Sequence, residues 1–259
     1  MNHIVQQLLA GEKRQTGEAD MILEAAGWAA SSYANFDRAR VDAITRAAAE
    51  AGYTVAGVLA EAAVKETGFG VAAHKKIKNE LTSRGLYELY RGEDFCSARI
   101  MPDKKMVELP RPAGVIFGLT PSTNPVCTVF FKILLALMTR NAIVISPHPM
   151  AKVCSAEAAR VMAAAAEKAG APAGVIQVIE TPSMPLIDHI MKSPKINVIL
   201  ATGGTPMVRA AYSSGNPAIG VGPGNAPILV DATADIDLAA KRIVESKSFD
   251  NSILCTNES

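Results

Sequence analysis

The pattern of apolar and polar positions changes character near Gly114. Before it, Ala-rich segments speckled with charges carry apolar residues at helical spacing, over residues 19–32, 37–51, 54–66 and 71–87. A polar, Pro-bearing passage comes next, in which residues 106–109 have the composition of a brief strand. We therefore expect residues 1–100 to form a mainly helical layer.

After Gly114, short β-rich runs alternate with helical stretches. The predicted strands cover residues 115–119, 142–146, 175–179, 198–201 and 218–221, with a further short strand at 228–230. The predicted helices cover residues 126–139, 151–169, 186–192 and 206–213, with a capped helix at about 235–248. Apolar strands that alternate with helices imply a parallel sheet covered on both faces. The sequence therefore predicts an α/β fold, with a doubly wound, Rossmann-like parallel sheet over residues 113–231 beside the N-terminal helical layer.

Composition excludes several classes of partner. The chain is 49% apolar, which suffices for a sizeable core. Lys and Arg number 26 against 25 Asp and Glu, without long blocks, so no basic stripe offers the electrostatics that nucleic acid requires. The longest nearly apolar run, residues 126–138, is too short to span a bilayer and contains Lys132. We expect it to be a buried helix, and we expect neither nucleic acid nor membrane as a partner.

Cysteine and histidine usage indicates a reducing compartment without a metal site. The first residues lack the basic region of a secretory signal. The cysteines fall at no metal-ligand or disulfide spacing: Cys96, Cys127, Cys154 and Cys255. Three histidines lie in helical contexts without metal-ligand spacing, and we assign them to the surface: His3, His74 and His189. We therefore expect a cytoplasmic protein with no metal centre.

Ligands bind at the carboxyl ends of parallel strands, so the loops after each strand carry the candidate chemistry. The loop after the first core strand ends in Asn124 and Pro125, ahead of an apolar helix. Asn at the N-cap with Pro next is a helix-start signature. The alternative is that the Asn124 amide donates a hydrogen bond to a developing oxyanion.

Two glycine-bearing loops lie after later strands. Thr202, Gly203, Gly204 and Thr205 let the backbone approach a ligand at a helix start, which favours a pyrophosphate. The simpler interpretation is a tight turn capped by Thr205. The run 220–224 has a tempting glycine spacing, but residues 225–230 have the composition of a strand instead of a helix, so the dinucleotide fingerprint fails on context.

Two further positions have open interpretations. Ser146 and His148 come after the second core strand, where a domain that binds NAD usually offers a carboxylate to the ribose, and none is present. His148 can meet a ribose or a 2′-phosphate, or simply face solvent. Cys255 comes after an apolar pair and is either a small buried hydrophobe or a nucleophile, and spacing alone does not decide between them.

Four motifs in order resemble the aldehyde dehydrogenase superfamily, and most closely its CoA-acylating branch. They are PSTNP at 121–125, ATGGT at 201–205, GVGPGNAP at 220–227 and DNSILC at 250–255. The likeness extends upstream to KETG at 65–68 and to Lys78 with Asn79. It covers nearly the whole chain, and four ordered motifs are far more specific than any single one.

The resemblance implies a role for each matched residue. The resemblance implies that Cys255 is the nucleophile. It also implies that the Asn124 amide and the backbone N–H of Cys255 donate hydrogen bonds to the oxyanion. The resemblance assigns Thr202, Gly203, Gly204 and Thr205 to the pyrophosphate of a nicotinamide dinucleotide. It assigns Ser146 and His148 to the ribose, and Pro223 and Gly224 to the nicotinamide side. Four more residues complete the expected cofactor-binding set: Thr120, Pro121, Val221 and Gly222.

One position separates the branches of the superfamily. Hydrolytic members carry a glutamate that activates water where this chain has Val221. Valine accepts no proton, so hydrolysis of an acyl-enzyme lacks its general base, whereas a thiol needs far less help. We therefore expect reversible, NAD-dependent oxidation of a small aldehyde to acyl-CoA, with NADP left open. The alternatives are a hydrolytic enzyme that releases the free acid and a catalytically silent nucleotide-binding fragment.

Superfamily members are about twice as long as this chain. By resemblance, residues 1–245 form the cofactor-binding domain and residues 246–259 begin the catalytic domain that carries Cys255. We expect the 259 residues to turn over little or no aldehyde by themselves. We also expect a homo-oligomer in the full-length form. Residues 1–10 resemble the leader helices that dock on microcompartment shells, although simple packing on the protein's own surface explains their apolar side chains as well.

Overall fold

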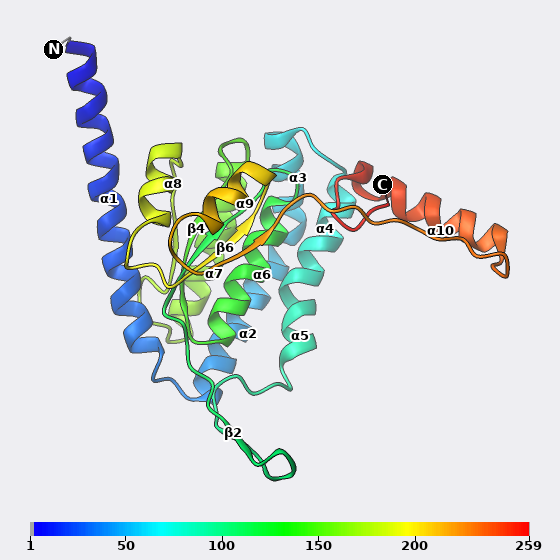
Figure 1. Cartoon of the computed structure of the whole chain (residues 1–259), viewed down its shortest axis with the longest axis horizontal. Helices are drawn as coiled ribbons and strands as arrows, with labels where there is room; N and C mark the ends of the chain where they lie inside the picture. Colours follow the sequence, from blue (N-terminus) through cyan, green and yellow to red (C-terminus); the bar gives the residue numbers. More distant parts are fainter. Residues whose placement is uncertain (1–2, 259) are drawn as a thin grey trace.

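The computed structural model describes residues 3–258, with side chains from residue 16 onward. The expected N-terminal layer is helical: α1 (His3–Tyr33), α2 (Arg38–Thr54), α3 (Ala56–Thr67), α4 (Ala72–Glu80) and α5 (Leu86–Tyr90), with a π-helical turn at Leu81–Gly85. A two-stranded antiparallel hairpin comes next, made of β1 (Arg99–Met101) and β2 (Met106–Glu108). It projects away from the body of the molecule (Figure 1).

The predicted parallel sheet is confirmed. Its strands are β3 (Val115–Leu119), β4 (Ala142–Ser146), β5 (Ile176–Val178), β6 (Val198–Thr202) and β7 (Ala218–Val221). They lie in the order β5-β4-β3-β6-β7, and every neighbouring pair is parallel. The intervening helices are α6 (Pro125–Met138), α7 (Lys152–Lys168), α8 (Met184–Met191) and α9 (Thr205–Tyr212).

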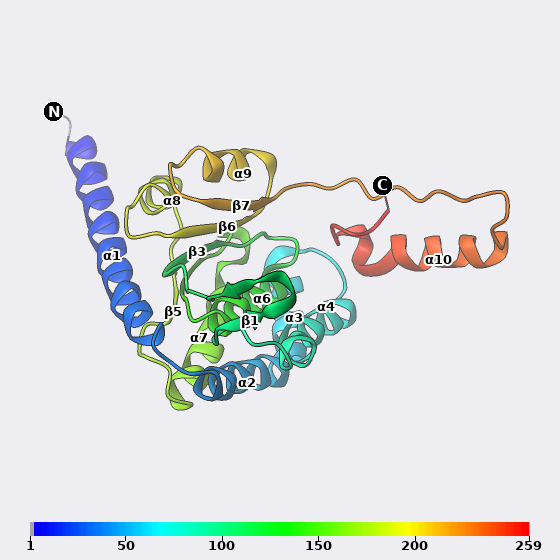
Figure 2. The same ribbon diagram turned by 60° about the horizontal axis from the view of Figure 1, so that its bottom comes forward.

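Helices cover both faces of the sheet, as a doubly wound fold requires (Figure 2). Helices α6 and α7 lie on one face, and α2 packs behind them as part of the N-terminal layer. Helices α1, α8 and α9 lie on the other face. The sheet is therefore buried between two helical layers.

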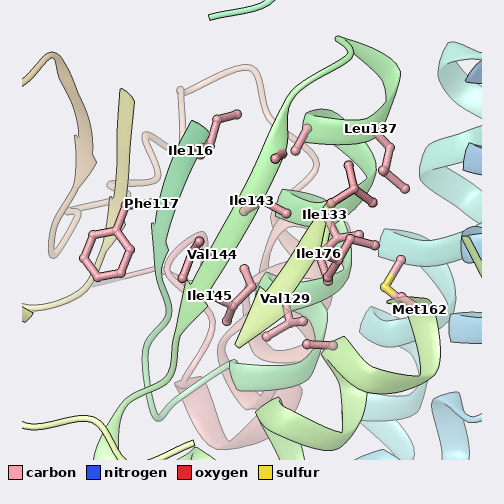
Figure 3. Packing of buried hydrophobic residues seen from close by; sticks show 14 of the residues in the cluster. Ile116, Phe117, Val129, Ile133, Leu137, Ile143, Val144, Ile145, Met162 and Ile176 are labelled. Atoms are coloured by element: carbon pink, nitrogen blue, oxygen red, sulfur yellow. The ribbon is translucent and has the colours of Figure 1, made fainter. Parts of the chain in front are cut away.

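The core lies between the sheet and α6 (Figure 3). Ile143 and Ile145 of β4 are fully buried, as are Val129 and Ile133 of α6. Because side chains alternate along a strand, Phe117 of β3 is buried on the opposite face. The apolar spacing of α6 thus matches the apolar face of the strands.

Lys132 is the polar exception in α6. It is 1% exposed, and its ammonium donates to the carbonyls of Leu119 and Leu200 at 2.6 Å each. Burial lowers its pKa to about 7.

In the described part of the chain, no helix is long and apolar enough to cross a membrane.

The strand order reverses between β3 and β6, which are neighbours in the sheet although β4 and β5 separate them in sequence. In open α/β sheets a crevice forms outside the carboxyl ends of the strands at such a switch point. The loops that leave β3 and β6 carry Asn124 and Gly203. Topology therefore brings the two predicted ligand loops side by side at the carboxyl edge of the sheet.

One predicted strand is wrong. Residues 222–231 run without regular structure between β7 and the last helix, α10 (Ile236–Ser248). The apolar run at 228–230 has the composition of a strand, but a strand also needs a hydrogen-bonding partner, and this segment pairs with none of the described strands. Leu229 is 93% exposed there. The predicted cap of the last helix is confirmed, since the Asp235 side chain accepts from Leu238 N–H.

Candidate active site

Two buried hydroxyls mark the carboxyl edge of the sheet. Thr120 comes directly after β3 and is 4% exposed, and Ser146 ends β4 and is 1% exposed. The Thr120 N–H donates to the Ser146 carbonyl at 3.1 Å, so the two residues are adjacent. Neither side-chain oxygen has a hydrogen-bond partner among the described residues. Buried hydroxyls are normally paired, so this edge fits the polar groups of a bound nucleotide.

The Asn124 amide does not cap its helix, which corrects the simpler interpretation of this loop. Asn124 holds the N-cap position of α6, but its side chain makes no capping hydrogen bond. Its Oδ1 accepts from the Lys78 ammonium, and its Nδ2 donates to the Ile253 carbonyl at 3.3 Å. The amide therefore faces the loop that carries Cys255, two residues further on.

Cys255 is the exposed cysteine of the four in the sequence. A Cβ atom on Gly224 would lie 3.5 Å from the Cys255 carbonyl, so residues 223–224 pass beside the predicted nucleophile. Burial raises the pKa of the Cys127 thiol, against the charges of Lys78 and Lys75, and raises that of Cys154 to about 12. The pKa of Cys96 is likewise raised by burial. Exposure therefore favours Cys255 over the other thiols as a nucleophile.

A strained turn, Phe249–Ser252, precedes this loop. Asp250, Asn251 and Ser252 have φ angles of 51°, 55° and 60°, in the left-handed region that costs a non-glycine residue about 1–2 kcal/mol. Asp250 N–H donates to His74 Nδ1 at 2.9 Å, and the Phe249 ring stacks on the same imidazole at 4.5 Å. The surrounding structure thus holds a conformation that the chain alone would not adopt.

The Asp250 carboxylate joins this turn to α4. It is fully buried, accepts from Val71 N–H at 2.7 Å, and contacts two buried ammonium groups, Lys78 and, at 3.2 Å, Lys75. Burial works against the charged form, but the hydrogen bonds from Lys78 and Val71 and the two positive charges hold the pKa of Asp250 below its usual value. Burial and the neighbouring Lys78 lower the pKa of Lys75.

Glycine is required at position 70, where φ is 76°. A Cβ atom there would lie 2.3 Å from Asp250 Oδ1. The chain from α3 to α4 therefore passes directly over the Asp250 carboxylate, and only a residue without a side chain leaves room for it.

The loop after β6 also differs from expectation in its cap. Gly204 holds the N-cap of α9, with no side-chain cap, and Thr205 is already the first helical residue. Gly203 N–H donates to the Val221 carbonyl at 3.2 Å, which joins this loop to the end of β7. Val221 is 53% exposed at that end of the strand. Thr202, Gly203, Gly204 and Val221 therefore lie together at the sheet edge.

His148 caps the turn that comes directly after it, and its predicted ribose contact stays a prediction. Its ring is exposed, and Nδ1 accepts from Met150 N–H at 3.2 Å, where it caps a short 3-10 turn at Pro149–Ala151. The next helix, α7, is capped from elsewhere: the Glu66 carboxylate of α3 accepts from Val153 and Cys154 N–H at 2.8 Å each. A negative charge thus already occupies the N-terminus of α7.

Sequence patterns alone miss several residues of this site. Lys75 and Lys78 are three positions apart on α4, and nothing in the pattern shows that both are buried, since lysine is usually exposed. Asp250 and Glu66 lie within the quoted motifs, but the motifs assign neither of them a role. The assignment of His74 to the surface is wrong, because its half-buried ring binds the turn before Cys255.

Comparisons with known proteins identify the family of the chain. The profile of the aldehyde dehydrogenase family matches residues 5–259. The chain is 45% identical over 242 residues to the bifunctional aldehyde-alcohol dehydrogenase AdhE of Escherichia coli K12, covering 93% of this chain and 27% of that protein. The crystal structure of an acetylating aldehyde dehydrogenase from Geobacillus thermoglucosidasius superposes with a TM-score of 0.92 and 42% identity, over 95% of this chain and 55% of that one.

A third similar protein is a solved complex. It is the Rhodopseudomonas palustris propionaldehyde dehydrogenase with bound propionyl-CoA, which has a TM-score of 0.82 and 31% identity. The match covers 93% of this chain and 53% of that one. This chain thus spans about half the length of these two solved relatives. The fold, the ordered motifs and the profile match agree, and the chain belongs to the aldehyde dehydrogenase family.

Proposed function

We propose that this chain is the cofactor-binding part of an aldehyde dehydrogenase that oxidises a small aldehyde and transfers the acyl group to CoA. The observation that carries the proposal is the position of the exposed Cys255. It lies on a loop whose Ile253 carbonyl accepts a hydrogen bond from the Asn124 amide. A nucleophile on a loop that an amide donor contacts provides the groups that acyl chemistry through a cysteine requires. The acetylating and propionaldehyde dehydrogenases among its relatives support the same reaction.

In the proposed mechanism, the Cys255 thiolate attacks the aldehyde carbonyl. Asn124 Nδ2–H and the Cys255 backbone N–H donate to the oxyanion of the resulting thiohemiacetal. A bound nicotinamide dinucleotide supplies the hydride acceptor. Collapse of the oxyanion leaves a thioester on Cys255. CoA loses its thiol proton to solvent and attacks the thioester as a thiolate, so that acyl-CoA leaves and the Cys255 thiolate returns.

The dinucleotide fits the carboxyl edge of the sheet. The unpaired hydroxyls of Thr120 and Ser146 would hold its adenosine side, and the backbone at Gly203 and Gly204 would approach the pyrophosphate. The neighbouring glycines leave open space, since a Cβ atom on either would meet nothing closer than 3.7 Å. Residues 223–224, beside Cys255, would then face the nicotinamide.

Val221 favours CoA over water as the acyl acceptor. Its side chain lies at the exposed end of β7, and a valine offers a water molecule no proton acceptor. In a full-length enzyme that contains this chain, we expect steady NADH production only when CoA is present. Without CoA, NADH formation should stop after one equivalent, because the thioester persists.

The measurement is NADH absorbance with and without CoA, together with chromatography of the products. Val221→Glu should restore slow turnover without CoA, and Val221→Gln, which has a similar size but no basic oxygen, should not. Equal rates with and without CoA in the unsubstituted enzyme, with free acid as the product, would instead establish the hydrolytic reaction.

Glu66 supports NAD over NADP. Its carboxylate occupies the N-terminus of α7, shortly after Ser146 and His148, where the ribose is proposed to bind. A 2′-phosphate would meet this negative charge, and a free ribose hydroxyl would not. We expect Glu66→Gln to strengthen NADP binding by about tenfold, which is the effect of about 1.4 kcal/mol, with little change for NAD.

Isothermal titration calorimetry of the full-length protein with each dinucleotide measures this effect directly. Glu61→Gln, on an exposed position of the same helix, is the matched control. If Glu66→Gln weakens the binding of both dinucleotides equally, Glu66 only caps α7 and does not select the cofactor.

The homo-oligomer, the cytoplasmic location and the shell-docking role stay predictions. The side chains of residues 1–10 lie outside the described part of the chain.

A further inference from the structure

A buried cluster of charges lies behind Asn124. Lys75 and Lys78 on α4 are 3% and 7% exposed, and Asp250 is 0% exposed. Two ammonium groups thus face one carboxylate, which leaves the cluster with a net positive charge. Buried charges destabilise a fold unless they are paired and hydrogen-bonded, so each contact in the cluster constrains its neighbours.

Lys78 makes the contact that matters for the amide. Its ammonium donates both to Asp250 Oδ2 and to Asn124 Oδ1. An ammonium group accepts no hydrogen bond, so it can face only the oxygen of an amide. The Asn124 nitrogen must then point the other way, and it donates to the Ile253 carbonyl at 3.3 Å. Lys78 therefore decides which end of the Asn124 amide faces the loop of Cys255.

We propose that Lys78, anchored by Asp250, is a positioning residue that fixes the orientation of the Asn124 amide so that its N–H groups face the reacting carbonyl. The inference rests on the proposed function and adds a residue to it. Without Lys78, a flipped amide would present its oxygen to the oxyanion and repel it. The adjacent positive charge also strengthens the amide as a donor, because hydrogen bonds in a chain polarise one another.

Lys75 provides an internal comparison. It contacts the same Asp250 carboxylate at 3.2 Å, but its other partner is the Thr123 carbonyl of the backbone, at 2.8 Å, and not the amide. Lys75 shares the burial and charge of Lys78 without touching the Asn124 side chain. A role in stability alone would belong to both lysines, whereas orientation of the amide belongs to Lys78.

The test is a double-mutant cycle in the full-length enzyme, with kcat and KM measured for Lys78→Met, Asn124→Ala and the combination. We expect Lys78→Met to lower kcat by about tenfold to a hundredfold, as misplaced catalytic groups do, with KM within about threefold. In the Asn124→Ala background, Lys78→Met should have almost no further effect, because the group it positions is gone. Lys75→Met should lower kcat by the same factor in both backgrounds.

The outcomes separate the inference from the function. If Lys78→Met leaves kcat unchanged, or lowers it equally with and without Asn124, Lys78 does not act through the amide and the inference is overturned. If Cys255→Ser keeps full activity, the proposed function itself fails. Circular dichroism checks folding. If Lys78→Met does not fold, Lys78→Gln replaces it in the cycle. Glutamine still donates a hydrogen bond, but it has no charge and can also accept one, so it no longer fixes the Asn124 amide. The effects of Lys78→Gln and Asn124→Ala should be non-additive in the same way.

Discussion

Replacing Cys255 by serine should abolish aldehyde oxidation in a full-length enzyme that contains this chain, with a loss in kcat of at least about a thousandfold. The hydroxyl has nearly the same shape but is neutral at pH 7, so it is a far weaker nucleophile than a thiolate. The rate of NADH formation with aldehyde, dinucleotide and CoA measures the effect. Dinucleotide binding should survive, because Cys255 is exposed and supports no packing.

The other cysteines supply the control for this experiment. Cys96→Ser changes a half-buried thiol on the loop before β1. Because this residue lies outside the proposed site, activity should remain within about twofold of the parent. If Cys255→Ser retains substantial activity while another cysteine variant loses it, the nucleophile has been assigned to the wrong residue.

Removal of the Asn124 amide should have the second largest effect. We expect Asn124→Ala to lower kcat by about a hundredfold to a thousandfold, the cost of removing one oxyanion donor. Activity should not vanish, because the proposed second donor, the Cys255 backbone N–H, remains. The carboxamide is half-buried and caps nothing, so the loss of stability should be small compared with the loss of rate.

Asn124→Asp sharpens this prediction. A carboxylate has nearly the shape of the amide and would pair with Lys78, so the variant should fold well. It has no N–H to donate, however, and its charge repels a developing oxyanion. Activity at or below that of Asn124→Ala, with an unchanged melting temperature, is the expected result. If the aspartate variant retains parental kcat, the amide donates no hydrogen bond in the reaction.

The elements of the fold were predictable because their signals are local. Helix α6 and strands β3 and β4 follow from apolar spacing alone, and each ends within one residue of its predicted bounds. The failure at 228–230 has the opposite cause. An apolar run indicates that a segment can form a β-strand. Whether it does so depends on a partner strand, which the run itself does not specify.

The site was predictable only in part. Motif resemblance selected Cys255 and Asn124, but spacing could not distinguish a helix cap from an amide held by tertiary contacts. The amide is held by Lys78, which lies 46 residues earlier in the chain. No residue propensity indicates that this lysine is buried. Three consecutive positive φ angles from Asp250 are equally invisible in the sequence, since they persist through contacts with α4.

The central claim is that Cys255 carries the acyl group. Incubation of the full-length enzyme with acetyl-CoA, acid quenching and mass spectrometry of the proteolytic peptides tests it most directly, because the reverse transfer needs no aldehyde. The peptide that contains Cys255 should gain the mass of one acetyl group and lose it on addition of CoA. An active enzyme that is acetylated at another residue, or at none, would contradict the account.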